Sequence, residues 1–102
     1  MIKITTIITA ITLTLATTTA QASPISDFCY DIADLTEIVA EARDRGISRT
    51  KAKTIVAQAG YGDLLELALE LVDVAYDNPW ETPSELMADT YQTCMVTLST
   101  PV

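Results

Sequence analysis

The chain has 102 residues, of which 49% are hydrophobic, and its 14 acidic side chains outnumber its six basic ones for a net charge of −8. It contains no histidine, which excludes nucleophilic catalysis of the Ser-His or Cys-His type. Because an acidic chain repels anionic polymers, we also expect no nucleic-acid partner.

The first 22 residues have the pattern of a secretory signal peptide. Lys3 is the only charge near the start, an uncharged stretch covers residues 4–20, and Ala20-Gln21-Ala22 supplies a small-x-small cleavage site. The alternative is a membrane anchor, which needs about 20 predominantly apolar residues, and this stretch is short and rich in threonine. We therefore predict cleavage before Ser23, a periplasmic or secreted protein, and no stable membrane insertion after cleavage.

The two cysteines bear on how the remaining domain is stabilised. Residues 23–102 are predicted to form one domain of 80 residues, near the size at which a hydrophobic core alone barely suffices. Cys29 and Cys94 allow one intramolecular disulfide, which would close a loop of about 65 residues and contribute about 4 kcal/mol. Two free buried thiols or an intermolecular bridge are the alternatives. A metal site is not expected, because histidine and Cys-x-x-Cys pairs are both absent.

Two helices are predicted in the first half of this domain. Apolar residues at helical spacing predict a first helix over residues 26–45, which Gly46 ends. A shorter helix over residues 49–59 follows, with Ser48 as its N-cap and Gly60 beyond its end.

The third and fourth helices follow from the same periodicity. Residues 64–77 are so apolar that we expect this helix to be the central one, showing water only a thin acidic ridge, with Asp63 as its cap. The four polar positions of the ridge are Glu66, Glu70, Asp73 and Asp77. Thr82-Pro83-Ser84-Glu85 then has the form of a capping box that begins the last helix. No segment alternates with period two, so the predicted fold is a small all-α domain of four helices, with Cys29 and Cys94 linking the first and the last.

Three short motifs carry a resemblance to a known group of proteins. They are Glu41-Ala42-Arg43-Asp44-Arg45-Gly46 after the early cysteine, Val72-Asp73-Val74-Ala75-Tyr76-Asp77-Asn78-Pro79 at the end of the third helix, and Tyr91-Gln92-Thr93-Cys94. With these motifs the chain resembles small exported two-cysteine proteins of proteobacteria and their phages or plasmids. The resemblance covers residues 28–95 and implies an all-helical, disulfide-linked fold. It carries over no activity and no catalytic residue.

A cluster of basic residues is the strongest functional signal in the sequence. After removal of Lys3 the balance is five basic against 14 acidic side chains, a net charge of −9. All five basic residues fall within one short stretch, here called the basic corner: Arg43, Arg45, Arg49, Lys51 and Lys53. The last three begin the second helix, where the helix dipole makes each cation unfavourable by about 0.3–1 kcal/mol. A partner-binding role would explain this placement, and the alternative is a partial balance of the acidic surface.

Two aromatic loop residues, Tyr61 and Trp80, are candidate anchors for the same partner. The alternative is that they cover the ends of a small core. Acid-base catalysis by carboxylates spaced four apart on the acidic ridge is not expected, because a domain this small offers little room for a substrate cleft. A specific metal site is not expected either, because no loop gathers several acidic residues.

The sequence therefore predicts a small exported interaction protein that is not an enzyme and needs no cofactor. We expect a monomer or weak dimer that uses the basic corner to inhibit or modulate an envelope protein, an anionic envelope component, or a phage or plasmid component. The alternative function is an acid-stress or envelope-stress holdase, in which protonation of carboxylates loosens the fold and exposes apolar helix faces.

Overall fold

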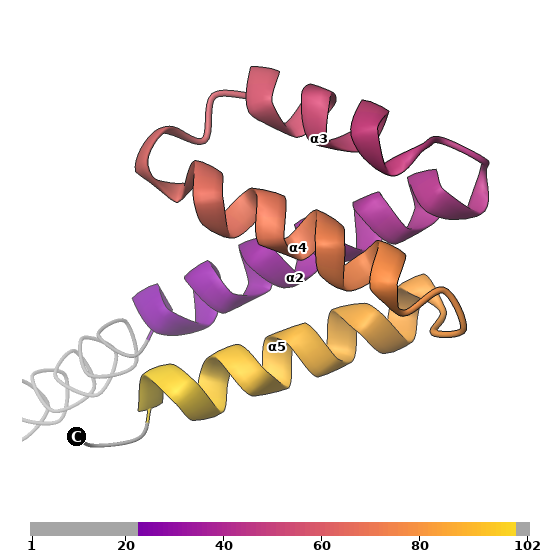
Figure 1. Ribbon diagram of the computed structural model, residues 1–102. Coiled ribbons are helices and arrows are strands. Elements are labelled where there is room, and N and C mark those ends of the chain that lie inside the picture. Colours follow the sequence, from indigo (N-terminus) through magenta and orange to yellow (C-terminus); the bar gives the residue numbers. More distant parts are fainter. Residues whose placement is uncertain (1–22, 100–102) are drawn as a thin grey trace, which may run out of the picture.

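The computed structural model describes residues 23–99, and this part of the chain is built of helices joined by short turns, without a strand (Figure 1). The predicted all-α class and its four helices are confirmed. The predicted signal peptide, residues 1–22, and residues 100–102 lie outside the described part. No helix in residues 23–99 is both long enough and apolar enough to cross a membrane. The elements are α2 (Ser23–Asp44), α3 (Arg49–Gln58), the 3-10 turn η1 (Gly62–Leu64), α4 (Leu65–Asp77) and α5 (Pro83–Ser99).

The end of α2 is a Schellman motif centred on Gly46. The backbone N–H of Ile47 donates to the carbonyl oxygen of Ala42 at 3.1 Å, and the N–H of Gly46 donates to that of Arg43 at 3.0 Å. Gly46 has a φ of 89°, a left-handed conformation that costs glycine little. The predicted stop at this glycine is confirmed.

Two of the three predicted helix caps are also confirmed. Ser48 accepts a hydrogen bond from the backbone N–H of Lys51 at the start of α3. Thr82 and Glu85 form the reciprocal capping box of α5. The N–H of Glu85 donates to the Thr82 hydroxyl at 3.2 Å, and the N–H of Thr82 donates to the Glu85 carboxylate at 3.0 Å.

The predicted cap at Asp63 is wrong. Asp63 lies inside η1, and the residue before α4 makes no side-chain capping bond. The N–H of Leu64 donates instead to the carbonyl oxygen of Tyr61 at 3.1 Å. This tighter turn satisfies a backbone donor that a capping side chain would otherwise take.

The central helix is α2, so the prediction that residues 64–77 form the central helix is also wrong. Both α4 and α5 pack on α2, α5 most extensively, whereas the backbones of α4 and α5 rarely approach each other (Figure 1). On α4, Leu71, Val72 and Ala75 are buried, but Val74 is 40% exposed. The many apolar residues of α4 predicted that this helix is buried on most sides. In the structure α5 packs on α2 instead of on α4, so the side of α4 that carries Val74 stays uncovered.

Small side chains allow the other helices to approach α2 closely. Cys29, Ala33, Thr36 and Ala40 recur every three or four residues along α2, and each is fully buried. The Thr36 hydroxyl donates to the carbonyl oxygen of Ile32 at 3.0 Å, so this buried polar group is satisfied. The main core continues from this stripe to the other helices. Its members are Val39 and Ala40 of α2, Ala52 and Val56 of α3, Ala68, Val72 and Ala75 of α4, and Leu86 of α5.

A disulfide joins the first and last helices of the described part. Cys29 and Cys94 are bonded, with their Cα atoms 5.5 Å apart, so the predicted intramolecular pairing is confirmed. The sequence separation of 65 residues corresponds to about 4 kcal/mol in the chain-entropy model. Near this bridge the hydroxyl groups of Ser26 and Tyr91 are hydrogen-bonded at 3.1 Å. These contacts hold the end of α5 against the beginning of α2.

At the opposite end of the helix bundle, Arg43 links α2 to the end of α4 and to the turn before α5. One terminal nitrogen of its guanidinium donates to the carbonyl oxygens of Ala75 at 2.7 Å and Asn78 at 3.1 Å, and the other donates to that of Glu81 at 2.7 Å. The guanidinium also pairs with Asp44, and only 8% of the Arg43 side chain is exposed. Because α4 ends at this point, the positive charge meets the negative end of the helix dipole.

We expect replacement of Arg43 by Met to destabilise the fold by about 2–3 kcal/mol, because hydrogen bonds to a charged donor are lost and their carbonyl acceptors stay partly buried. Urea unfolding of the protein measures this change. The control is Arg45→Met, at an exposed neighbouring position, with an expected effect within about 0.5 kcal/mol. Equal unfolding midpoints for the two variants would contradict a structural role for Arg43.

Candidate functional site

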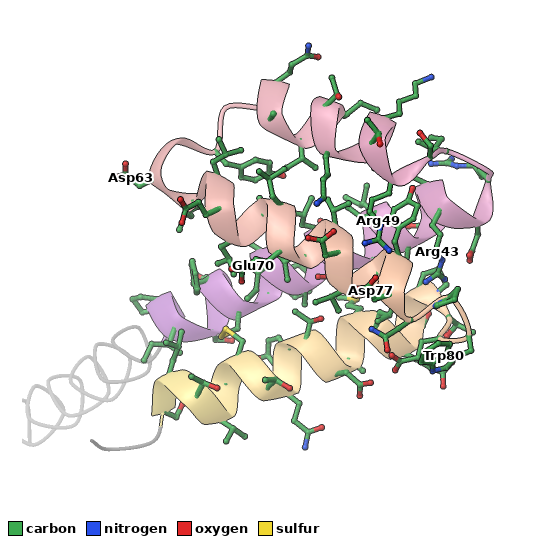
Figure 2. All side chains as sticks on the ribbon, in the orientation of Figure 1. Arg43, Arg49, Asp63, Glu70, Asp77 and Trp80 are labelled. Atoms are coloured by element: carbon green, nitrogen blue, oxygen red, sulfur yellow. A yellow bond between two sulfur atoms is a disulfide. The ribbon has the colours of Figure 1, made fainter. Side chains whose placement is uncertain are left out.

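The basic corner lies where α2 turns into α3, and its five members have different surroundings (Figure 2). Arg43 points towards the end of α4 and is engaged by carbonyl oxygens there. A side chain that is only 8% exposed offers a partner little surface. Arg43 therefore belongs to the structural framework of the molecule.

Arg49 and Lys53 form ion pairs with α4. Arg49 contacts Asp77 at 2.6 Å and Asp73 at 3.3 Å, and the Lys53 ammonium contacts Asp73 at 2.8 Å. Arg49 also lies over the ring of Tyr76, with 5.8 Å between its Cζ atom and the ring centroid. Two members of the basic corner are thus neutralised by the acidic ridge of α4.

The pKa values of these groups follow from the pairing. A hydrogen bond from Lys53, aided by the charge of Arg49, lowers the pKa of Asp73 below its usual 3.8. The hydrogen bond with Asp77 is the main cause of the raised pKa of Arg49. Burial raises the pKa of Tyr76 above its usual 10.0, and its hydroxyl donates to the carbonyl oxygen of Ile47. These contacts join α3, α4 and the end of α2.

Arg45 and Lys51 are the members of the basic corner that remain exposed. Within residues 23–99, neither side chain takes part in an ion pair. Two exposed cations on a chain with 14 acidic residues make a weak electrostatic feature.

The two predicted aromatic anchors lie at opposite ends of α4. Tyr61 precedes η1, before the beginning of α4, whereas Trp80 lies in the turn after it and is 74% exposed. A helix of 13 residues separates them, which corresponds to about 20 Å. Figure 2 shows this separation through Asp63, in the turn beside Tyr61, and Trp80 at the other end. The structure therefore does not bring Tyr61 and Trp80 into one site.

An apolar groove between α4 and α5 is the feature that the sequence analysis missed. It has a volume of about 430 Å³ and is open to solvent, and α2 contributes its floor through Phe28 and Ile32. The exposed surface of its lining is almost entirely apolar. The sequence feature that could have revealed the groove is the large number of apolar residues on α4, which we interpreted as burial of this helix on most sides. Its apolar lining includes Phe28 and Ile32 of α2, Leu67 and Val74 of α4, and Leu86 and Leu98 of α5.

Two acidic residues lie at one end of this groove. Glu81 and Asp89 belong to its lining, and the hydrogen bond between their carboxyl groups is the main cause of the raised pKa of Glu81. The negative charges of Asp89 and Glu85 raise that pKa further, while Arg43 lowers it. Negative charge is therefore crowded here and only partly compensated.

The carboxylates of the described residues do not gather into a metal site. No group of three or more Cys, Asp or Glu side chains within residues 23–99 is placed to hold a metal ion. On the acidic ridge, Asp73 and Asp77 are engaged by Arg49. Within the described residues, the groove is an apolar surface with two carboxyl groups, those of Glu81 and Asp89, at one end.

We expect Asp73→Asn to reduce the dependence of stability on pH. A carboxyl whose pKa is lowered by folding stabilises the protein above the unfolded-state pKa, and this contribution disappears as the pH falls through the folded-state value. The variant is therefore less stable than the parent at about pH 6, and the difference closes towards about pH 2. Urea unfolding across this range measures it. The control is Asp63→Asn, which removes the same charge from the exposed η1 turn; an equal effect of both variants would contradict the role of the ion pairs.

Comparisons with known proteins do not add to this description. No family model, no curated protein and no solved structure matches the chain. The resemblance to exported two-cysteine proteins therefore stays a prediction. Several of the residues that carry it have physical roles, among them Arg43, which holds the end of α4, Gly46, which ends α2, and Cys94, which forms the disulfide.

Proposed function

We propose that this protein is a small exported interaction protein without enzymatic activity, and that it binds a partner of the cell envelope in the groove between α4 and α5. The groove is the observation that carries the proposal. An open apolar channel of about 430 Å³ on a domain of this size is unusual for a surface with no partner, because water contact with apolar side chains is unfavourable. The disulfide supports export, since such bonds persist in oxidising compartments.

The basic corner supports partner binding less well than the groove does. Arg43, Arg49 and Lys53 are held by contacts within the molecule, and a partner would have to replace those contacts before it gained any energy. Arg45 and Lys51 alone give a small positive surface. A groove that is already formed needs no such rearrangement, so we place the partner there.

The proposal is tested with a photo-crosslinking amino acid at two positions in the native envelope. Thr90 lies in the groove, and Lys51, an exposed position of the basic corner on α3, is the matched control. We expect one discrete adduct from position 90 and none from position 51, and loss of that adduct when Thr93 of the groove is replaced by Trp. Adducts only from position 51 would place the partner at the basic corner, and an adduct of twice the protein's own mass would identify a second copy.

The second candidate, an acid-stress holdase, is favoured by the ion pairs between α3 and α4. Because Arg49 and Lys53 depend on Asp73 and Asp77 remaining ionised, acid weakens the attachment of α3. The apolar residues that α3 covers, including Ala68 and Val72 of α4, would then become accessible.

Light scattering by an aggregating client protein tests the holdase candidate. We expect suppression of aggregation at about pH 3 and none at about pH 7, with Asp73→Asn shifting the onset to higher pH because the attachment of α3 is already weakened. Asp63→Asn serves as the control at the same net charge. Unchanged client aggregation at about pH 2–4 would eliminate this candidate.

A further inference from the structure

The shape of the groove limits what can occupy it. Its lining on α5 runs from Leu86 to Leu98, a length of about 18 Å or three helical turns. The facing wall is formed by Leu67, Leu71 and Val74, which recur every three or four residues along α4. Two helical walls with an α2 floor present a continuous apolar strip. An amphipathic helix of three to four turns fits such a strip, with its own apolar residues spaced in the same way.

The charges at the groove have one sign. Glu81 and Asp89 belong to the lining, and no Lys or Arg does. Glu70 follows Leu67 by three residues and precedes Val74 by four, which places it on the same side of α4. Figure 2 shows Glu70 on the edge of α4 that faces α2 and α5.

The cations within residues 23–99 leave these carboxylates largely unbalanced. Arg43 is the nearest cation to Glu81, and its N–H donors are already directed at backbone carbonyls and Asp44. The remaining cations of the described part lie at the α2–α3 turn and on α3. The hydrogen bond that raises the pKa of Glu81 is a sign of the same crowding, since a second negative charge beside Asp89 is unfavourable.

We propose that the groove between α4 and α5 binds a cationic amphipathic helix of a partner protein. The apolar face of that helix lies against Phe28, Leu67 and Leu86, and its Lys or Arg residues contact Glu70, Glu81 and Asp89. This inference rests on the proposed function and specifies the chemistry of the partner. A second copy of this chain is a poorer occupant, because it would bring a body with net charge −9 to an acidic rim.

The test compares two synthetic helical peptides of about 14 residues. Both have the same leucine face, and the opposite face carries lysines in one peptide and glutamates in the other. We expect the lysine peptide to bind the exported protein at least about tenfold more tightly in isothermal titration calorimetry, with an affinity that falls as salt is added.

Two variants of the protein distinguish the contribution of the carboxyl groups to binding from that of the apolar lining. Glu81→Gln with Asp89→Asn is expected to weaken the lysine peptide about tenfold and to flatten its salt dependence, while leaving the apolar lining unchanged. The matched control, Glu41→Gln with Asp63→Asn, removes two charges from exposed positions outside the lining and is expected to change binding less than about twofold. Thr93→Trp is expected to block binding of both peptides by filling the groove. If this variant fails to fold, the comparison of the two charge variants still tests the inference.

The outcomes distinguish this inference from the proposed function. Equal binding of the two peptides, with blocking by Thr93→Trp, would overturn the cationic partner and keep the groove as a binding site. Failure of both peptides while position 90 still gives a crosslinked adduct would also overturn the cationic helix alone. A dimer in sedimentation that Thr93→Trp dissociates would assign the groove to a second copy. No peptide binding together with no adduct from position 90 would overturn both proposals.

Discussion

Arg43, at the end of α2, donates hydrogen bonds to backbone carbonyl oxygens at the end of α4 and in the turn that leads to α5. The arrangement of the helices depends on these partly buried hydrogen bonds. A guanidinium suits the position because it presents several donors in a plane, whereas a lysine would supply a single charged group. At the other end of the molecule, Cys29–Cys94 fixes α5 to α2. Arg43 holds the end of α4 and the turn into α5 beside α2, and the disulfide holds the far end of α5 on α2. Away from the turn that joins them, α4 and α5 therefore diverge across α2 (Figure 1). The groove between α4 and α5 is the consequence.

The basic residues of α3 and the acidic residues that they contact on α4 interact unfavourably with the dipole of their own helix, but favourably with each other. Arg49 and Lys53 lie near the positive end of the α3 dipole, while Asp73 and Asp77 lie towards the negative end of the α4 dipole, and each misplaced charge costs about 0.3–1 kcal/mol. The structure brings the two sets into contact as ion pairs of 2.6–3.3 Å. The placement that suggested a binding surface therefore has a structural cause. With these cations engaged, the acidic surface of the protein has little positive charge left to display.

The proposed binding role of the groove rests on the apolar surface that the helices leave uncovered. Val74 stays 40% exposed although it belongs to the most apolar helix within residues 23–99. The surrounding lining continues this apolar surface along three helices. Glu81 and Asp89 give the surface a charge as well as a shape. In the proposed complex, the apolar strip provides affinity by removing water, and the carboxyl groups of Glu81 and Asp89 select among amphipathic partners by the sign of their charge.

The sequence by itself determined the local structure of this protein, and only the tertiary structure decided the roles of its charged and apolar surfaces. Helical periodicity, the caps at Ser48 and Thr82 and the stop at Gly46 were predictable because they depend on residues within one or two turns. The disulfide was predictable because two cysteines allow one internal pair. The position of α2 at the centre depends on which faces pack together, and that choice involves contacts between residues far apart in the chain. The roles of Arg43 and Arg49 depend on acceptors 24 to 38 residues away, so a cluster of cations in the sequence could not reveal that most of them are engaged inside the fold.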